Sequence, residues 1–172
     1  MKKIAYVFII ILAILSSCQF SSNKDAKYYF GTGNKKAELG DYRGAIKDYT
    51  KAIELNPKDA NAYYNRGNNK IKLGDQIGAI KDFTKTIELN PEDVEAYSNR
   101  AKAKVELGDD NEALKDFTKT IELNPEDGDA YILRGVVNYS LGDKKSACLD
   151  WTKAGELGEV DAYAFIKKYC NL

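Results

Sequence analysis

The sequence predicts an all-α protein, a right-handed superhelical solenoid of four helical hairpins followed by a C-terminal capping helix. The first observation behind this prediction is an internal period of 34 residues, and the second is the spacing of apolar residues within each period. The same interval separates four sets of residues: Pro57, Pro91 and Pro125; Gly40, Gly74, Gly108 and Gly142, each followed by aspartate; Ala45, Ala79, Ala113 and Ala147; and Tyr49, Phe83, Phe117 and Trp151. A fixed period of this length indicates stacked helical repeats.

Each period contains two helices, because its apolar and small residues recur at spacings of three and four. Between the two helices of the second period, Gly74 suits a left-handed position after the first helix, and Asp75 can cap the second. Pro91 then ends the second helix, since proline has no backbone N–H. In the third period, Asp109 and Glu112 have the spacing of a capping box.

The period resembles the tetratricopeptide repeat (TPR), a family of helical hairpins with an aromatic residue at the fourth position, Gly or Ala at the eighth, Ala at the twentieth, an aromatic at the twenty-fourth and Pro at the thirty-second. The residues at the fourth and eighth positions are Tyr29, Tyr63, Tyr97 and Tyr131, then Gly33, Gly67, Ala101 and Gly135. The resemblance implies four units, at residues 26–59, 60–93, 94–127 and 128–161. Small residues at the eighth and twentieth positions let the two helices of a unit approach closely.

The chain departs from the family at two positions that recur from unit to unit. The seventh position, usually leucine in the family, is arginine in units two to four, and the twenty-third is always aspartate. These residues are Arg66, Arg100 and Arg134, and Asp48, Asp82, Asp116 and Asp150. We expect the arginines to pair with aspartates across the two helices of a unit, in a structural role.

The last unit has no proline, and residues 162–172 after it are predicted to form the capping helix. In this register Ala164 and Phe165 stand at the third and fourth positions of a further first helix. Lys167 and Lys168 make the helix a solvated end, which a solenoid needs.

The first 17 residues have the pattern of a signal peptide. Lys2 and Lys3 precede an uncharged run of about 12 residues, which is shorter than the ~20 residues of a membrane-spanning helix. Leu15, Ser16, Ser17 and Cys18 resemble the lipobox of bacterial lipoproteins, and the resemblance implies cleavage before Cys18 and its lipidation. The alternative is an ordinary secretory signal with an incidental cysteine.

Residues 18–25 would then form the lipidated cysteine and a polar tether. The resemblance places the protein in the bacterial cell envelope, anchored to the membrane by lipid. Gln19 instead of aspartate after the cysteine favours the outer membrane, facing either the periplasm or the cell surface.

Cys148 and Cys170 form either a disulfide or two free thiols. Counted from the turn at Gly158, they lie ten residues back and twelve forward, so an antiparallel hairpin would bring them nearly level. Outside the cytoplasm a disulfide between them could persist. Redox catalysis is not expected, because the sequence has no Cys-x-x-Cys pair.

In the TPR family the first helices of the units line a concave groove, so the resemblance implies a set of groove residues. They are Phe30, Asn34, Tyr64, Asn65, Asn68, Lys72, Ser98, Asn99, Lys102, Ile132, Val136 and Tyr139. Some members bind the carboxylate tails of heat-shock chaperones with lysines, asparagines and an arginine. Asn34 and Asn65 match that clamp, but Glu95 and Asn99 stand at its basic positions, and Glu95 would repel a carboxylate.

Composition excludes several classes of function. Lys plus Arg equals Asp plus Glu at 26 each, so no basic excess suits the chain to nucleic acid. There is no histidine, no glycine-rich phosphate loop and no carboxylate pair set apart from the repeat, and we predict neither enzymatic activity, nor a cofactor, nor a metal site. Two functions remain. The first is a membrane-anchored adaptor whose groove binds a peptide or helix of an envelope protein. The second is a structural subunit of a cell-envelope assembly, or a self-associating spacer, that uses the convex face or the solenoid ends.

Overall fold

The computed structural model describes residues 24–170, and every element within that range is a helix. The first helix covers residues 24–38. It is followed by α2 (Tyr42–Leu55), α3 (Ala60–Lys72), α4 (Gln76–Leu89), α5 (Val94–Glu106), α6 (Asp110–Leu123), α7 (Gly128–Ser140), α8 (Lys144–Glu156) and α9 (Val160–Tyr169). The predicted signal peptide and Cys18 lie outside the described residues. The predicted tether ended at residue 25, but Lys24 and Asp25 already belong to the first helix.

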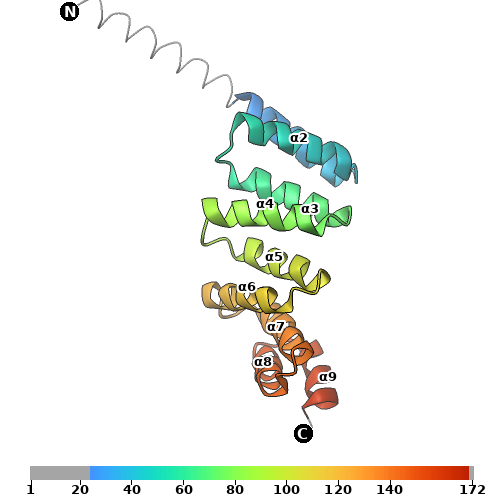
Figure 1. Cartoon of the computed structure of the whole chain (residues 1–172), viewed down its shortest axis with the longest axis vertical. Helices are drawn as coiled ribbons and strands as arrows, with labels where there is room; N and C mark the ends of the chain where they lie inside the picture. Colours follow the sequence, from blue (N-terminus) through green and yellow to red (C-terminus); the bar gives the residue numbers. More distant parts are fainter. Residues whose placement is uncertain (1–23, 171–172) are drawn as a thin grey trace, which may run out of the picture.

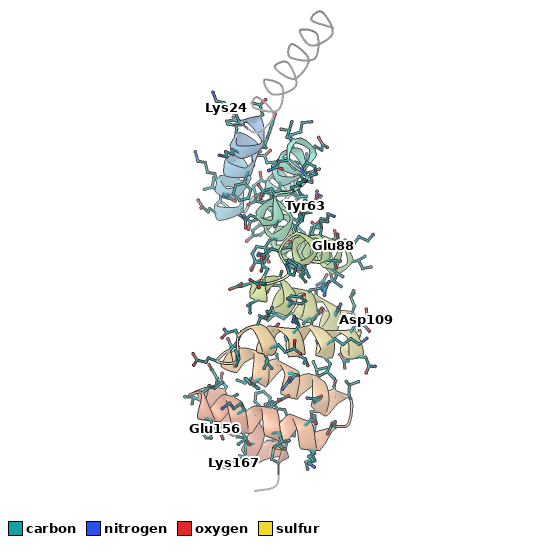
Figure 2. The ribbon with its side chains drawn as sticks, turned by 90° about the vertical axis from the view of Figure 1, so that its left-hand side faces the viewer. Lys24, Tyr63, Glu88, Asp109, Glu156 and Lys167 are labelled. Atoms are coloured by element: carbon teal, nitrogen blue, oxygen red, sulfur yellow. A yellow bond between two sulfur atoms is a disulfide. The ribbon has the colours of Figure 1, made fainter. Side chains whose placement is uncertain are left out.

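The helices stack in chain order along one axis (Figure 1), and from α2 to α8 each helix packs against the helix that follows it. Figure 2 labels Lys24 and Lys167 at opposite ends of this stack. The described chain is therefore an all-α repeat superhelix, as the 34-residue period predicts. Within a unit the first helix is an A helix and the second a B helix.

Glycine and aspartate make the turn inside each unit. Gly40, Gly74, Gly108 and Gly142 have φ between 78° and 86°, a left-handed conformation that other residues rarely adopt. In α2, α4 and α8 the next aspartate accepts a hydrogen bond from the backbone N–H three residues on. The capping box predicted at Asp109 is wrong, because its side chain makes no cap hydrogen bond and Glu112 pairs with Lys115 instead.

In units two and four the two helices approach so closely that the glycine at the eighth position leaves no room for a Cβ atom. A Cβ atom added to Gly67 would lie 2.9 Å from the ring of Phe83, and one added to Gly135 would lie 2.5 Å from Trp151 Nε1. The aromatic rings are themselves at most 1% exposed. Small residues and aromatic rings thus fill the space between the two helices of a unit.

The predicted arginine–aspartate pairs are confirmed in units two to four. Arg100 donates from Nε and Nη2 to the two carboxylate oxygens of Asp116, at 2.8 and 2.7 Å. Its Nη1 donates to Thr84 Oγ1 of the preceding unit at 3.0 Å, and its guanidinium lies 5.6 Å from the centroid of the Tyr97 ring. Arg66 and Arg134 repeat this arrangement. One guanidinium therefore joins three helices from two units.

The capping helix starts earlier than predicted. It is α9, which begins at Val160 rather than residue 162 and has Cys170 as its C-cap. Ala162, fully buried, takes the third position that the sequence analysis assigned to Ala164. The shift has a local cause: α8 is one residue shorter than the preceding B helices, and a three-residue turn at Gly158 replaces the four-residue turn with proline.

Candidate functional site: a concave groove and a disulfide-bonded end

Three cavities open on the first helices of units two to four. The largest, about 590 Å³, lies between α3 and α5, and one of about 480 Å³ lies between α3, α5 and the start of α7. A smaller one of about 150 Å³ separates α5 from α7. All three share one side chain, that of Lys102. The cavities together form the groove.

Asparagine side chains that are hydrogen-bonded from one unit to the next, here called the amide ladder, run along the first half of the groove. Asn65 Nδ2 donates to Asn34 Oδ1 at 3.2 Å, and Asn99 Nδ2 donates to Asn68 Oδ1 at 3.1 Å. Each bond joins the sixth position of one unit to the ninth position of the unit before. Tyr49 fixes the first rung by donating its hydroxyl to Asn34 at 2.8 Å. Burial raises the pKa of the Tyr49 phenol above its ordinary value, so the phenol keeps the proton that it donates.

The second half of the groove is apolar. At the sixth position unit four has Leu133 in place of an asparagine, and the ninth position of unit three is Lys102. The ladder therefore stops after Asn99. The small cavity here is lined by Lys102, Val105, Glu106, Phe117, Leu133, Val136 and Val137.

Lysines in the groove differ from the lysines between the helices. Lys70 and Lys104 lie between helices and bind the carboxylates of Asp82 and Asp116 at 2.8 and 2.7 Å. Lys72 and Lys102 both line the largest cavity, and within residues 24–170 neither forms a salt bridge. Their ammonium groups can therefore serve a ligand.

Negative charge gathers at the neighbouring cavity. Glu95, Asp127 and Asp129 line it together with Tyr64, Ser98 and Lys102. A carboxylate that bound there would face three like charges. The groove thus changes from acidic at the start of α5 and α7 to basic near the end of α3.

Seven of the twelve predicted groove residues line these cavities: Tyr64, Asn68, Lys72, Ser98, Asn99, Lys102 and Val136. Asn34 and Asn65 form the first rung of the ladder, and Phe30 lies beside Tyr49 with ring centroids 5.8 Å apart. Ile132 accepts the indole N–H of Trp151 with its carbonyl, and Tyr139 packs on Trp151 and Tyr169. None of these five residues lines one of the three cavities.

Phe165 was predicted at the fourth position of a further first helix, but the earlier start of α9 moves it to the sixth. Its ring stacks on that of Trp151, with ring centroids 5.1 Å apart. Lys168 then falls at the ninth position. The signal for this register was the absence of proline after Trp151, which allowed a shorter turn.

A disulfide joins Cys148 of α8 to Cys170 at the end of α9, with Cα atoms 5.7 Å apart. Both cysteines line a surface cavity of about 540 Å³ on the side of Leu149 and Thr152. Within the described residues no cluster of side chains could hold a metal ion. Nor is any helix between residues 24 and 170 both long and apolar enough to cross a membrane.

Stacked helical hairpins with a lined concave groove define the chain as an α-solenoid of the protein-interaction class. A family model described as TPR repeat matches residues 33–74, and one described as tetratricopeptide repeat matches residues 60–93 and 94–127. The matches together span residues 33–127, more than half of the 172 residues. The chain belongs to the tetratricopeptide-repeat family. These models describe repeat modules and indicate no catalytic family.

Solved structures share the fold. The crystal structure of MamA protein is 27% identical with a TM-score of 0.78, and the match covers 81% of this chain and 78% of that one. The first TPR of Spaghetti (RPAP3), bound to the HSP90 peptide SRMEEVD, is 28% identical with a TM-score of 0.67, over 70% of this chain and 95% of that one. A TPR protein from Parabacteroides merdae, 21% identical with a TM-score of 0.79, matches in fold over 86% of this chain and 61% of that one. No curated protein matches the sequence.

Proposed function

We propose that the protein is a lipid-anchored adaptor of the bacterial envelope, whose groove binds an extended peptide or a helix of a partner protein. The observation that carries this proposal is the groove itself, in which three cavities meet at Lys102. Amide side chains along it can donate hydrogen bonds to a peptide backbone and accept them from it. The ring of Tyr64 offers contact area at low entropic cost.

The two halves of the groove suit different parts of a ligand. The half around Asn68, Lys72 and Asn99 offers polar and cationic groups, whereas the half around Leu133 and Val136 offers aliphatic ones. A ligand that crosses Lys102 would therefore pass from polar contacts to apolar ones. A relative 28% identical to this chain has been solved with a bound peptide, which supports a peptide as the ligand. Glu95 disfavours an acidic tail at the start of α5.

The groove is tested by replacing Tyr64, Asn68 and Lys102 with alanine together and crosslinking the variant in intact cells. We expect its crosslinked partners to be lost, because all three side chains line the cavities. The matched control replaces three exposed lysines of the B helices, Lys47, Lys81 and Lys115, which line none of the cavities. Partners retained by the groove variant, or lost equally in the control, would refute groove binding.

The anchor is tested separately through Cys18, because lipidation and groove binding are independent. The pattern Leu15 to Cys18 supports lipidation, and a residue with several acyl chains would be held stably in a membrane. Anchoring would also raise the local concentration of the groove near partners in the same membrane. Replacing Cys18 with serine should move the protein from the membrane fraction to the soluble fraction. A variant that stays with the membranes would exclude the lipid anchor.

Self-association through the C-terminal end is the second candidate. Leu149, Val160 and Tyr163 on α8 and α9 are 63%, 78% and 59% exposed, which makes this end more apolar than a solvated cap. Light scattering on the C18S variant measures its mass directly. If the protein is a dimer and the variant L149K/Y163K is a monomer, the structural role is favoured. If the protein is a monomer at all concentrations, the adaptor function is favoured.

A further inference from the structure

The disulfide lies in the surface cavity of about 540 Å³, which the groove does not use. Cys148 and Cys170 are partly exposed, and Lys144 and Lys145 stand at the rim with Leu149 and Thr152. Neither lysine forms a salt bridge in the part of the chain that the structure describes. A thiolate approaching the sulfur atoms is an anion, and two ammonium groups beside its path attract it.

The disulfide lies at the joint between unit four and α9. At the earlier joints between units, an arginine makes the contact instead. Thr50, Thr84 and Thr118 each accept a hydrogen bond from the arginine of the next unit. Within residues 24–170 the equivalent Thr152 receives no such bond, since Ile166 takes the position of that arginine in α9. The hydroxyl of Thr152 donates to the carbonyl of Cys148. A covalent bond therefore replaces the arginine contact at the last joint alone.

Apart from the bridge, a small set of contacts holds α9. Phe165 and Tyr169 lie on Trp151 with centroids 5.1 and 5.7 Å away, and Tyr163 donates its hydroxyl to the carbonyl of Gly155 at 3.2 Å. Ala162 is buried at the start of the helix. A helix of ten residues is only marginally stable alone, so α9 depends on these contacts and on the bond at its last residue.

The register of α9 also continues the pattern of the A helices. Phe165 and Lys168 stand at the sixth and ninth positions, so a fifth row of these two positions follows Leu133 and Val136 of unit four. Tyr139 packs against Tyr169 with centroids 4.7 Å apart, which joins this row to α7. If α9 leaves, the fifth row goes with it and Trp151 is uncovered.

We propose that Cys148–Cys170 is a thiol–disulfide exchange site for a dithiol protein of the envelope, and that its reduction releases α9 from Trp151. One thiolate of the partner attacks one sulfur of the bridge, which forms a mixed disulfide and expels the other cysteine as a thiolate that takes up a proton. The second thiol of the partner loses its proton and attacks the mixed disulfide, which releases the second cysteine. The partner is oxidised to a disulfide by two electrons, and this chain gains two thiols. The location of the partner in the envelope and any effect on the groove rest on the proposed function.

The test uses the full chain in detergent micelles with dithiothreitol as the dithiol and no groove ligand. The chain has one tryptophan, so emission reports Trp151 alone. We expect that reduction without denaturant makes both cysteines available for alkylation and shifts the Trp151 emission to longer wavelength. Hydrogen exchange in α9 should become about 100-fold faster, whereas the exchange rates in α3 to α6 should not change. Because no ligand is present, failure of the groove proposal would not alter these readouts.

Two variants complete the experiment. K144E/K145E should slow reduction about tenfold, since it turns the attraction of the thiolate into repulsion, whereas K81E/K115E on other B helices should not. C148A/C170A should show the emission of the reduced protein whatever the redox buffer, with circular dichroism confirming that the other helices are intact. The proposal is overturned if the bridge resists dithiothreitol until the chain unfolds, if reduction leaves Trp151 emission and α9 exchange unchanged, or if both lysine variants react at the wild-type rate.

Discussion

The first unit and the units after it differ at the positions that meet a preceding unit. Units two to four have alanine at the third position, at most 1% exposed, whereas the first unit has Tyr28, 66% exposed. The seventh position is arginine in units two to four and Thr32 in the first. The arginine is therefore present only where a threonine of a preceding unit accepts its Nη1 hydrogen bond. The comparison teaches that its role is to join units as well as to pair with its own aspartate.

The largest effect is expected from D116A. This change leaves the guanidinium of Arg100 and the ammonium of Lys104 without their carboxylate, and both side chains are at most 15% exposed. We expect the free energy of unfolding to fall by about 3–5 kcal/mol, measured by urea denaturation with circular dichroism. In the first unit the equivalent Asp48 binds only Lys36, which is 41% exposed, so D48A should cost less than about 1 kcal/mol. Equal losses would contradict the comparison.

A smaller effect is expected from G135A. The added Cβ would lie 2.5 Å from Trp151 Nε1, so the ring must shift, and its hydrogen bond to Ile132 must weaken. We expect a loss of about 1–3 kcal/mol, seen as a lower melting temperature. The matched control is G31A in the first helix, where no atom lies within 4 Å of the new Cβ. This variant should gain about 0.5–1 kcal/mol from helix propensity, and a loss there would show that the cost at Gly135 does not come from the close approach of Trp151.

The smallest effect is expected from T84V, which removes the acceptor that Arg100 uses in the preceding unit. A cost of about 1 kcal/mol in urea denaturation is expected, because Arg100 keeps both bonds to Asp116. T152V is the control that separates the contribution of the bond between Arg100 and Thr84. Thr152 makes the same contact with its own helix but receives no arginine, so its change should cost measurably less. If the two variants lose the same stability, the bond between units contributes nothing.

Part of the groove could be predicted from the sequence repeat, and part could not. Seven of the predicted groove residues line cavities because a residue at a given position of a regular repeat meets the same neighbours in every unit. Glu106 and Leu133 were missed, since cavities form between units and depend on which side chains face one another across α5 and α7. Phe165 was assigned to the fourth position instead of the sixth, because a turn shortened by one residue and a helix shortened by another shift the register of everything after Gly158.

The sequence by itself determined the all-α solenoid, the close approach of the two helices in each unit and the arginine–aspartate pairs. These features are local, and they recur every 34 residues, so one unit predicts the next. Only the tertiary structure decided where α9 begins, how the groove divides into an amide half and an apolar half, and that Cys148 and Cys170 share a disulfide facing a cavity. These features arise where the repeat stops being regular, and their geometry depends on contacts between helices that no periodic pattern encodes.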